Sequence, residues 1–310
     1  MFDLQFNGLT TKNFSCDFWN SPSNSDIDFC LKYLFDQGIQ KILATIITDL
    51  PEKAYLNLKT IFDYQKNLHD SKKLLQTQIA GVHIEGGYIS RLGVHPVQYS
   101  RSYDLSFAKQ ILKDFPGLIK LWTLCPRVDA DGSLTAFLQD NNIVVSYGHS
   151  NASYQEAMQA FEKHKVNLVT HWGNAMFVFQ DFHQRNTSCQ ELLSLDELDI
   201  DSLSPDQLGL GLAAYRNPDV YCMAIAGSQE DADLHLDPQL LKHLAYKKLD
   251  KFILVSDCVA YTGPRPNNLV GGLNTLAKHK KNAILAGIEP ALVENALNAN
   301  IEAFFRKYSG

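Results

Sequence analysis

The chain has 310 residues, of which 45% are hydrophobic and 20% charged, and its formal net charge at pH 7 is −6. That length and hydrophobic content suffice for one large core, whereas a second sizeable domain would be cramped. The acidic balance excludes a basic footprint for nucleic acid or for an anionic membrane, so we expect small-molecule partners.

The predicted strands and helices alternate along the whole chain. Short β-type runs occur at Phe2–Phe6, Lys41–Ile47, Gln78–Ile84, Leu118–Leu124, Ile143–Ser146, Val166–Thr170, Val220–Ala226 and Phe252–Ser256. Amphipathic runs predict helices at Asp26–Gln37, Glu52–Leu68, Leu105–Asp114, Leu134–Asp140, Tyr154–His164 and Pro238–Lys248, with a closing helix at Pro290–Tyr308.

Eight alternations of strand and helix predict a TIM-type (β/α)8 barrel that occupies residues 1–310 as a single domain. A doubly wound open sheet is the second possibility. No G-x-G-x-x-G follows the first strand, however, which favours the barrel.

Residues 177–208 interrupt this alternation after the sixth predicted strand. The segment is rich in acidic and hydroxyl residues and is too long for an ordinary barrel loop. It is either a lid or partner surface over the catalytic face, or a solvated insertion with a short helix at Cys189–Leu195.

The cysteines and the N-terminus indicate a cytoplasmic protein. Six cysteines are scattered without any C-x-x-C pair, which is typical of free thiols in a reducing compartment. The first residues, MFDLQFNG, lack the regions of a signal peptide, and no apolar run approaches transmembrane length.

Polar side chains gather at the carboxyl ends of the predicted strands. Because the ends of parallel strands meet at one edge, His149 and His171 are expected to share a metal ion. With Glu85 they form a three-ligand set that leaves a position open for water, as in catalytic zinc sites. Each residue alone also has an ordinary structural explanation: a local hydrogen bond for either histidine, an ion pair for Glu85, a helix cap for Asp257. The other strand-end residues are Gln5, Asn7 and His235.

The residues also carry a family resemblance over most of the chain. The segments FDLQFNG, GVHIEGGYIS, GVHP, VVSYGHSNASYQEA, VTHWGNAM, DVYCMAIA, LHLDP and ILVSDCVAYTG occur in this order. Together they resemble the signatures of the N-acetylglucosamine-6-phosphate deacetylases of the amidohydrolase superfamily. The resemblance implies a barrel of the metal-dependent hydrolase type.

The same resemblance implies roles for individual positions. Glu85, His149 and His171 fall on the metal ligands, and Asp257 falls on the catalytic acid and base. Gln5 and Asn7 stand where other superfamily members have H-x-H, as in single-metal deacetylases. The residues that fall on the sugar-phosphate site are His95, Asn174, Ala175 and His235.

The chain departs from the family pattern in three places. The β-sandwich that flanks the barrel in the family is not seen, which leads us to expect a homodimer that covers the corresponding surface. The segment Gly227–Asp233 replaces a compact Asp-Gly, and Arg185 is a candidate for the arginine expected after the NAM segment. Gly87 stands where a proline usually follows EG.

We therefore expect a metal-dependent hydrolase that removes the acetyl group of N-acetylglucosamine-6-phosphate or of a close acetamido sugar. One divalent metal per chain is expected, with zinc first and Fe²⁺, Co²⁺ or Mn²⁺ permitted by the same ligands. Two alternatives stay open: an amidohydrolase of a different amide or cyclic ureide, and a non-catalytic metal-binding barrel.

Overall fold

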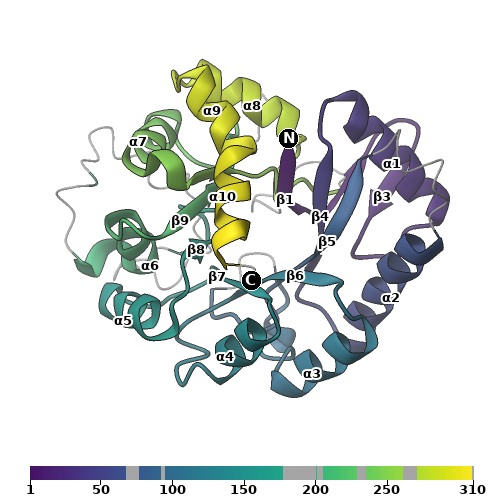
Figure 1. The fold of residues 1–310 in the computed structure, drawn as a ribbon, viewed down its shortest axis with the longest axis horizontal. Coiled ribbons are helices and arrows are strands. Elements are labelled where there is room, and N and C mark those ends of the chain that lie inside the picture. Colours follow the sequence, from purple (N-terminus) through teal and green to yellow (C-terminus); the bar gives the residue numbers. More distant parts are fainter. Residues whose placement is uncertain are drawn as a thin grey trace.

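Eight parallel strands follow one another around a barrel (Figure 1). The computed structural model describes residues 1–67, 77–91, 95–176, 200, 205–228, 235–260 and 271–308. The barrel strands are β1 (Phe2–Phe6), β4 (Lys41–Ile47), β5 (Gln78–Glu85), β6 (Ile119–Leu124), β7 (Val144–Tyr147), β8 (Leu168–Val169), β9 (Tyr221–Ala224) and β10 (Phe252–Leu254).

The first and last strands meet and close the barrel at its carboxyl end. The strands lie in sequence order from β1 to β10, and every neighbouring pair is parallel. The Asp257 N–H donates to the Gln5 carbonyl oxygen at 2.8 Å, and the Asn7 N–H donates to the Cys258 carbonyl oxygen at 2.9 Å. This closure confirms the TIM-type barrel and excludes the doubly wound sheet, whose strand order reverses at a switch point.

Helices surround the strands (Figure 1). In α5 (Tyr154–His164) the Ser153 side chain accepts from the Glu156 N–H while the Glu156 carboxylate accepts from the Ser153 N–H, a capping box that starts the helix. Ala157 and Phe161, one turn apart, are buried on its inner face. The helices are α1 (Asn24–Asp36), α2 (Pro51–Asn67), α3 (Leu105–Asp114), α4 (Ser133–Asp140), α5 (Tyr154–His164), α6 (Pro205–Arg216), α7 (Pro238–Lys248), α8 (Leu276–Leu285), α9 (Pro290–Leu297) and α10 (Ala299–Tyr308), with 3-10 turns η1 (Val97–Tyr99) and η4 (Leu249–Lys251).

Two helices and one β-hairpin were not expected from the sequence. Helix α6 escapes the pattern because Gly209 breaks its backbone regularity, at φ 48° and ψ −126°. Helix α8 is rich in lysine and has little apolar periodicity. The hairpin of β2 (Gly8–Thr10) and β3 (Ser15–Asp17) has strands of only three residues each.

Two predicted segments differ from the structure. The expected closing helix Pro290–Tyr308 is two helices, α9 and α10, separated at Asn298, where φ is −144° and ψ is −75°. The expected insertion, residues 177–208, ends inside α6. Most of that segment, including Arg185 and the helix predicted at Cys189–Leu195, lies outside the described residues.

Helix α10 closes the amino end of the barrel, opposite the closure between β1 and β10. In Figure 1 it crosses in front of the strands. Its Ile301 and Phe304 pack with Leu4, Leu121 and Ile253 in a hydrophobic cluster inside the barrel, separate from the larger cluster that includes the surrounding helices. The carboxyl end is therefore the end left for a site.

Above this cluster the barrel interior becomes polar. His83 Nδ1 lies 3.2 Å from the Leu4 carbonyl oxygen, which can only accept, so Nδ1 carries the proton. His83 Nε2 then accepts from Thr123 at 2.7 Å, Thr123 from Thr170 at 2.6 Å, and Thr170 from Ser146 at 2.7 Å. Burial lowers the pKa of His83 to about 4, which keeps it neutral. This directed chain ties four strands together beneath their carboxyl ends.

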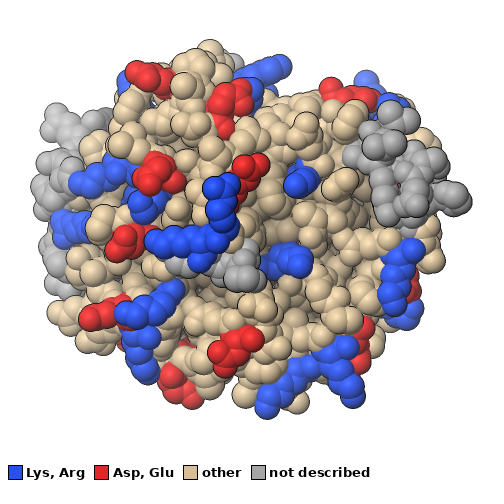
Figure 2. Space-filling model, in the orientation of Figure 1, with Lys and Arg blue, Asp and Glu red and all other residues tan. Residues whose placement is uncertain are grey.

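The outer surface on the α10 side carries both signs of charge. Figure 2 shows Lys and Arg side chains interspersed with Asp and Glu there, without a block of one sign. Among the helices that the structure describes, none combines the length and the apolar character needed to cross a membrane.

The carboxylate of Asp3 is buried where the barrel closes, so its protonation should affect the stability of the fold. Oδ1 accepts from the Ser256 N–H at 3.1 Å and from the Gln5 N–H at 3.3 Å, while Oδ2 makes no hydrogen bond with a described residue. Burial raises the pKa of Asp3 to about 6, so the folded state holds this proton more tightly than the unfolded chain.

The stabilisation from protonated Asp3 is therefore lost as pH rises from the unfolded pKa through the folded one. Asp3→Asn removes the titrating group. The free energy of unfolding of this variant minus that of the wild type should therefore be about 2 kcal/mol greater at pH 7.5 than at pH 4.5. Urea unfolding of both proteins at both pH values measures this difference. An equal effect of the substitution at the two pH values would contradict it.

Candidate metal and active site

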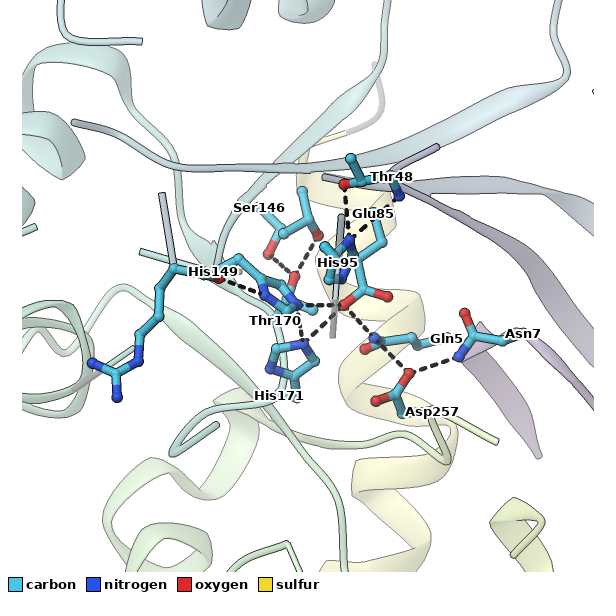
Figure 3. A network of polar contacts seen from close by, with 12 residues as sticks. Gln5, Asn7, Thr48, Glu85, His95, Ser146, His149, Thr170, His171 and Asp257 are labelled. Carbon is cyan, nitrogen blue, oxygen red and sulfur yellow. Dashed lines mark hydrogen bonds and ion pairs between the residues drawn. The ribbon is translucent and has the colours of Figure 1, made fainter. Parts of the chain in front are cut away.

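Three of the predicted site residues converge at the carboxyl end of the barrel (Figure 3). Glu85 is the last residue of β5, and His149 and His171 follow β7 and β8. Glu85 Oε1 lies 3.1 Å from His149 Nε2 and 2.8 Å from His171 Nε2, and the two Nε2 atoms are 3.1 Å apart. These side chains are up to 86 residues apart in the sequence, and they meet at the carboxyl ends of the strands.

The donor set and its spacing fit a divalent ion. Two imidazoles and one carboxylate are the ligand set of several catalytic zinc sites. Tetrahedral bonds of 2.0–2.1 Å place neighbouring donor atoms about 3.3 Å apart. The separations here are 2.8 and 3.1 Å, so a shift of about 0.5 Å or less would fit them to an ion. All three side chains are buried, and their donor atoms can face one ion.

Hydrogen bonding around His149 presents its Nε2 to the centre of this cluster. Nδ1 lies 2.9 Å from the Arg91 carbonyl oxygen and therefore donates to it. Nε2 is then the nitrogen whose lone pair is available to a metal, and a backbone oxygen behind the ring is a common way to orient a histidine ligand. Among described residues, His171 Nδ1 has no partner.

The charges in the cluster support one another. Burial by itself would raise the pKa of Glu85, but the hydrogen bonds from His149 and His171 outweigh it and hold this pKa well below its usual range. Burial would lower the pKa of His171, and the hydrogen bond to Glu85 reverses this and raises it. The buried Glu85 carboxylate is therefore stabilised by positive charge beside it, which either protonated histidines or a bound cation can supply.

Backbone strain concentrates at the same strand ends. His149, His171 and Asp257 have φ angles of 45°, 30° and 49°, and Ala175 has 52°. This left-handed region costs a residue other than glycine about 1–3 kcal/mol and is held only where the surroundings enforce it. Such strain is typical of functional sites, where it aims a side chain that a regular strand would point elsewhere.

Asp257 joins the cluster through an amide bridge. The Gln5 Nε2 donates to Glu85 Oε1 at 2.8 Å and to Asp257 Oδ1 at 2.9 Å. Asn7 Nδ2 donates to the same Asp257 oxygen at 2.7 Å, which leaves Oδ2 without a hydrogen bond to any residue described here. Burial, followed by the nearby charge of Glu85, raises the pKa of Asp257 well above its ordinary value.

The residues predicted to hold the sugar phosphate lie in three places. The His95 ring packs edge to face against the His149 ring, with centroids 4.3 Å apart, and burial lowers the pKa of His95 to about 3. The turn after His171 contains Asn174, whose N–H donates to the His171 carbonyl oxygen at 2.9 Å, and Ala175. His235 is buried just before α7. The rewritten segment Gly227–Asp233 lies largely outside the described residues.

One polar residue of this site, Thr48, was not predicted from the sequence. Thr48 directly follows β4 and contacts His95, with Thr48 Oγ1 2.8 Å from His95 Nδ1. Its position at a strand end was a usable signal. A threonine after a β-branched run is also typical of a continuing strand, however, and no neighbouring residue indicates its contact with His95.

Comparison with known proteins gives one consistent set of relatives. No family model matches the chain. The N-acetylglucosamine-6-phosphate deacetylase of Bacillus subtilis is 30% identical over 168 residues, which are 53% of this chain and 40% of that protein. The chain spans less than half the length of the curated relatives it matches.

Solved structures of deacetylases share the barrel. The N-acetylglucosamine-6-phosphate deacetylase of Pasteurella multocida has a TM-score of 0.74 and 24% identity, covering 97% of this chain and 75% of that one. A variant of the Mycobacterium smegmatis enzyme, in complex with N-acetyl-D-glucosamine-6-phosphate, has a TM-score of 0.73 and 17% identity, covering 99% and 76%. The resemblance expected from the motifs is thus confirmed: over about half of its length the chain is similar in sequence to N-acetylglucosamine-6-phosphate deacetylases, and it has the barrel fold of the solved ones.

Proposed function

We propose that the chain is a metal-dependent amide hydrolase that deacetylates N-acetylglucosamine-6-phosphate or a close acetamido sugar. The observation that carries this proposal is the buried Glu85, His149 and His171 cluster, linked to Asp257 by the Gln5 amide. A metal site beside a carboxylate of raised pKa is what hydrolysis of an amide requires. The names of the relatives support the same reaction and substrate class.

Glu85, His149 and His171 would hold one divalent ion, for which zinc is our first choice and Fe²⁺, Co²⁺ or Mn²⁺ are compatible. When bound, such an ion supplies Lewis acidity, which lowers the pKa of water toward about 7 and polarises a carbonyl oxygen. Gln5 and Asn7 hold Asp257 Oδ1, so Oδ2 is the atom placed to take a proton. Asp257 would accept it from the attacking water and pass it to the leaving amine.

The substrate would be held by His95, Asn174, Ala175 and His235. His95 is neutral at physiological pH and packs against a proposed ligand, so it can donate a hydrogen bond to an oxygen at the reacting centre or to a sugar hydroxyl. Asn174, in the turn after His171, would contact the distal anionic group. The sugar phosphate bound by the Mycobacterium smegmatis relative supports this class of ligand.

A different amide or a cyclic ureide is the second candidate substrate. The sequence AGSQEDADLH, in place of a compact Asp-Gly before His235, favours this reading because it changes the loop that precedes a proposed substrate residue. A panel of acetamido sugars with and without phosphate, extended to cyclic ureides, separates the two. A non-catalytic barrel is disfavoured, because an idle site has no use for the network that holds Asp257.

We also propose that residues 1–310 act as one barrel domain in the cytoplasm. Both clusters of the core are built from residues along the whole described chain, which supports a single unit. Five cysteines, Cys16, Cys30, Cys125, Cys222 and Cys258, are buried free thiols, which supports a reducing compartment.

Metal content tests the proposed ligands. We expect about one equivalent of a divalent metal per purified chain, and we expect His149→Ala and His171→Ala to lose it because a catalytic site has only three protein ligands. Elemental analysis after dialysis is the measurement. The matched control is His243→Ala, an exposed histidine of α7 that contacts Tyr215 and should leave the metal in place. Full occupancy in both ligand variants would refute the site.

The role of Asp257 is tested by Asp257→Asn. Asparagine can still accept from Gln5 and Asn7, but it cannot take a proton from water, so turnover should fall by about 10²–10⁴-fold with metal retained. The control is Asp104→Asn at the N-cap of α3, where Asp104 accepts from the Ser106 and Phe107 N–H groups and asparagine caps equally well. An active, metal-loaded Asp257→Asn protein would remove Asp257 from the mechanism.

A homodimer remains the expected assembly. Phe29 and Tyr33 of α1 are 60% and 41% exposed and pack around Phe14, so they form an aromatic patch of a kind usually covered by a partner. Light scattering at micromolar concentration should give twice the chain mass of 34.8 kDa, and Phe29→Asp should weaken the dimer. A wild-type mass equal to one chain would contradict this expectation.

A further inference from the structure

His95 is approached by two groups of Thr48 at the same nitrogen (Figure 3). The Thr48 backbone N–H points at His95 Nδ1 at 3.4 Å, and Thr48 Oγ1 lies 2.8 Å from that atom. A backbone N–H can only donate, so Nδ1 is the accepting nitrogen of the ring. In a neutral imidazole the proton then resides on Nε2, which makes no hydrogen bond with any residue that the structure describes.

The direction of the Thr48 hydroxyl agrees with this assignment. The Gly87 N–H donates to Thr48 Oγ1 at 2.7 Å and occupies one of its lone pairs. The hydroxyl proton is free to turn to His95 Nδ1, which completes a relay from the Gly87 backbone through Thr48 to His95. A proline at position 87 has no N–H and could not supply the first step.

The backbone around this relay leaves Thr48 little freedom. The Tyr103 hydroxyl donates to the Ile47 carbonyl oxygen at 3.0 Å and accepts from the Asp49 N–H at 2.8 Å, so both neighbours of Thr48 are tied to one ring. That ring also packs on Gly87, where a Cβ would lie 1.9 Å from it. The position of Thr48 is thereby set from both sides.

Gly86 leaves the space that the contact between Thr48 and His95 requires. A Cβ there would lie 2.2 Å from Thr48 Oγ1 and 3.3 Å from His95 Nδ1, and φ at Gly86 is +94°. Both glycines of the EGG segment therefore have positive φ angles and close neighbours that a side chain would displace. The segment directly after the proposed ligand Glu85 is shaped around the contact between Thr48 and His95.

We propose that Thr48 is a positioning residue that holds His95 as the Nε2–H tautomer, so that the ring presents a hydrogen-bond donor to the substrate. Thr48 acts through His95 and does not touch the substrate. Without the hydroxyl, the Nδ1–H tautomer becomes accessible, and Nε2 would then meet a substrate oxygen with a lone pair instead of a proton. The consequence for turnover rests on the proposed function, whereas the tautomer of His95 does not.

The tautomer is measured directly in the full-length chain by long-range ¹H–¹⁵N correlation of the imidazole nitrogens at neutral pH. We expect a protonated Nε2 on His95 in the wild type and in Thr48→Ser, which keeps the hydroxyl. In Thr48→Val, which has nearly the same shape, we expect a measurable population of the Nδ1–H form. His83 is an internal reference, because its contact with the Leu4 carbonyl oxygen requires the opposite tautomer.

Kinetics supply the second readout. We expect Thr48→Val to lower kcat/KM at least about tenfold, the effect of one hydrogen bond to a reacting group, and Thr48→Ser to stay close to the wild type. A protonated Nδ1 in wild-type His95, or an unchanged tautomer in Thr48→Val, would overturn the proposal. A wild type inert on every acetamido sugar, with the expected tautomers, would overturn the proposed function alone.

Discussion

The closure of the barrel and the assembly of the site depend on the same few contacts of Gln5. Its backbone oxygen accepts from the Asp257 N–H, which joins β1 to the end of β10, and its side-chain amide donates to both Glu85 and Asp257. Gln5, near the start of the chain, therefore bridges Glu85 at the end of the third barrel strand and Asp257 after the last one. A barrel that failed to close would have no pair of carboxylates at this edge.

The site also depends on what lies beneath it. Four residues at the strand ends hold positive φ angles, and strain of that kind persists only where the surrounding structure enforces it. The chain of hydrogen bonds from Ser146 through Thr170 and Thr123 to His83 supplies such support one layer below the proposed ligands. Helix α10 seals the other end of the barrel, so this polar layer of the barrel interior lies on the side of the site.

Different observations support the fold of this protein and its proposed function. The solved relatives are 24% identical or less, and their TM-scores establish the barrel, which hosts many chemistries. The proposed reaction rests instead on the ligand cluster, on Asp257 and on motif similarity over part of the chain. Gly87 adds a contact that a proline at this position could not make, because its N–H donates to the Thr48 hydroxyl that contacts His95.

The sequence by itself determined the barrel and the polar residues that cluster at its carboxyl end. Alternating strand and helix patterns are local signals, and the carboxyl ends of parallel strands meet at one edge whatever the loops do, so Glu85, His149, His171 and Asp257 could be found without coordinates. Only the tertiary structure decided the Gln5 bridge, the Thr48 relay, and the elements α6, α8 and the β2–β3 hairpin. Hydrogen bonds between residues 39 to 252 positions apart depend on register, rotamer and closure, which no short stretch of sequence encodes.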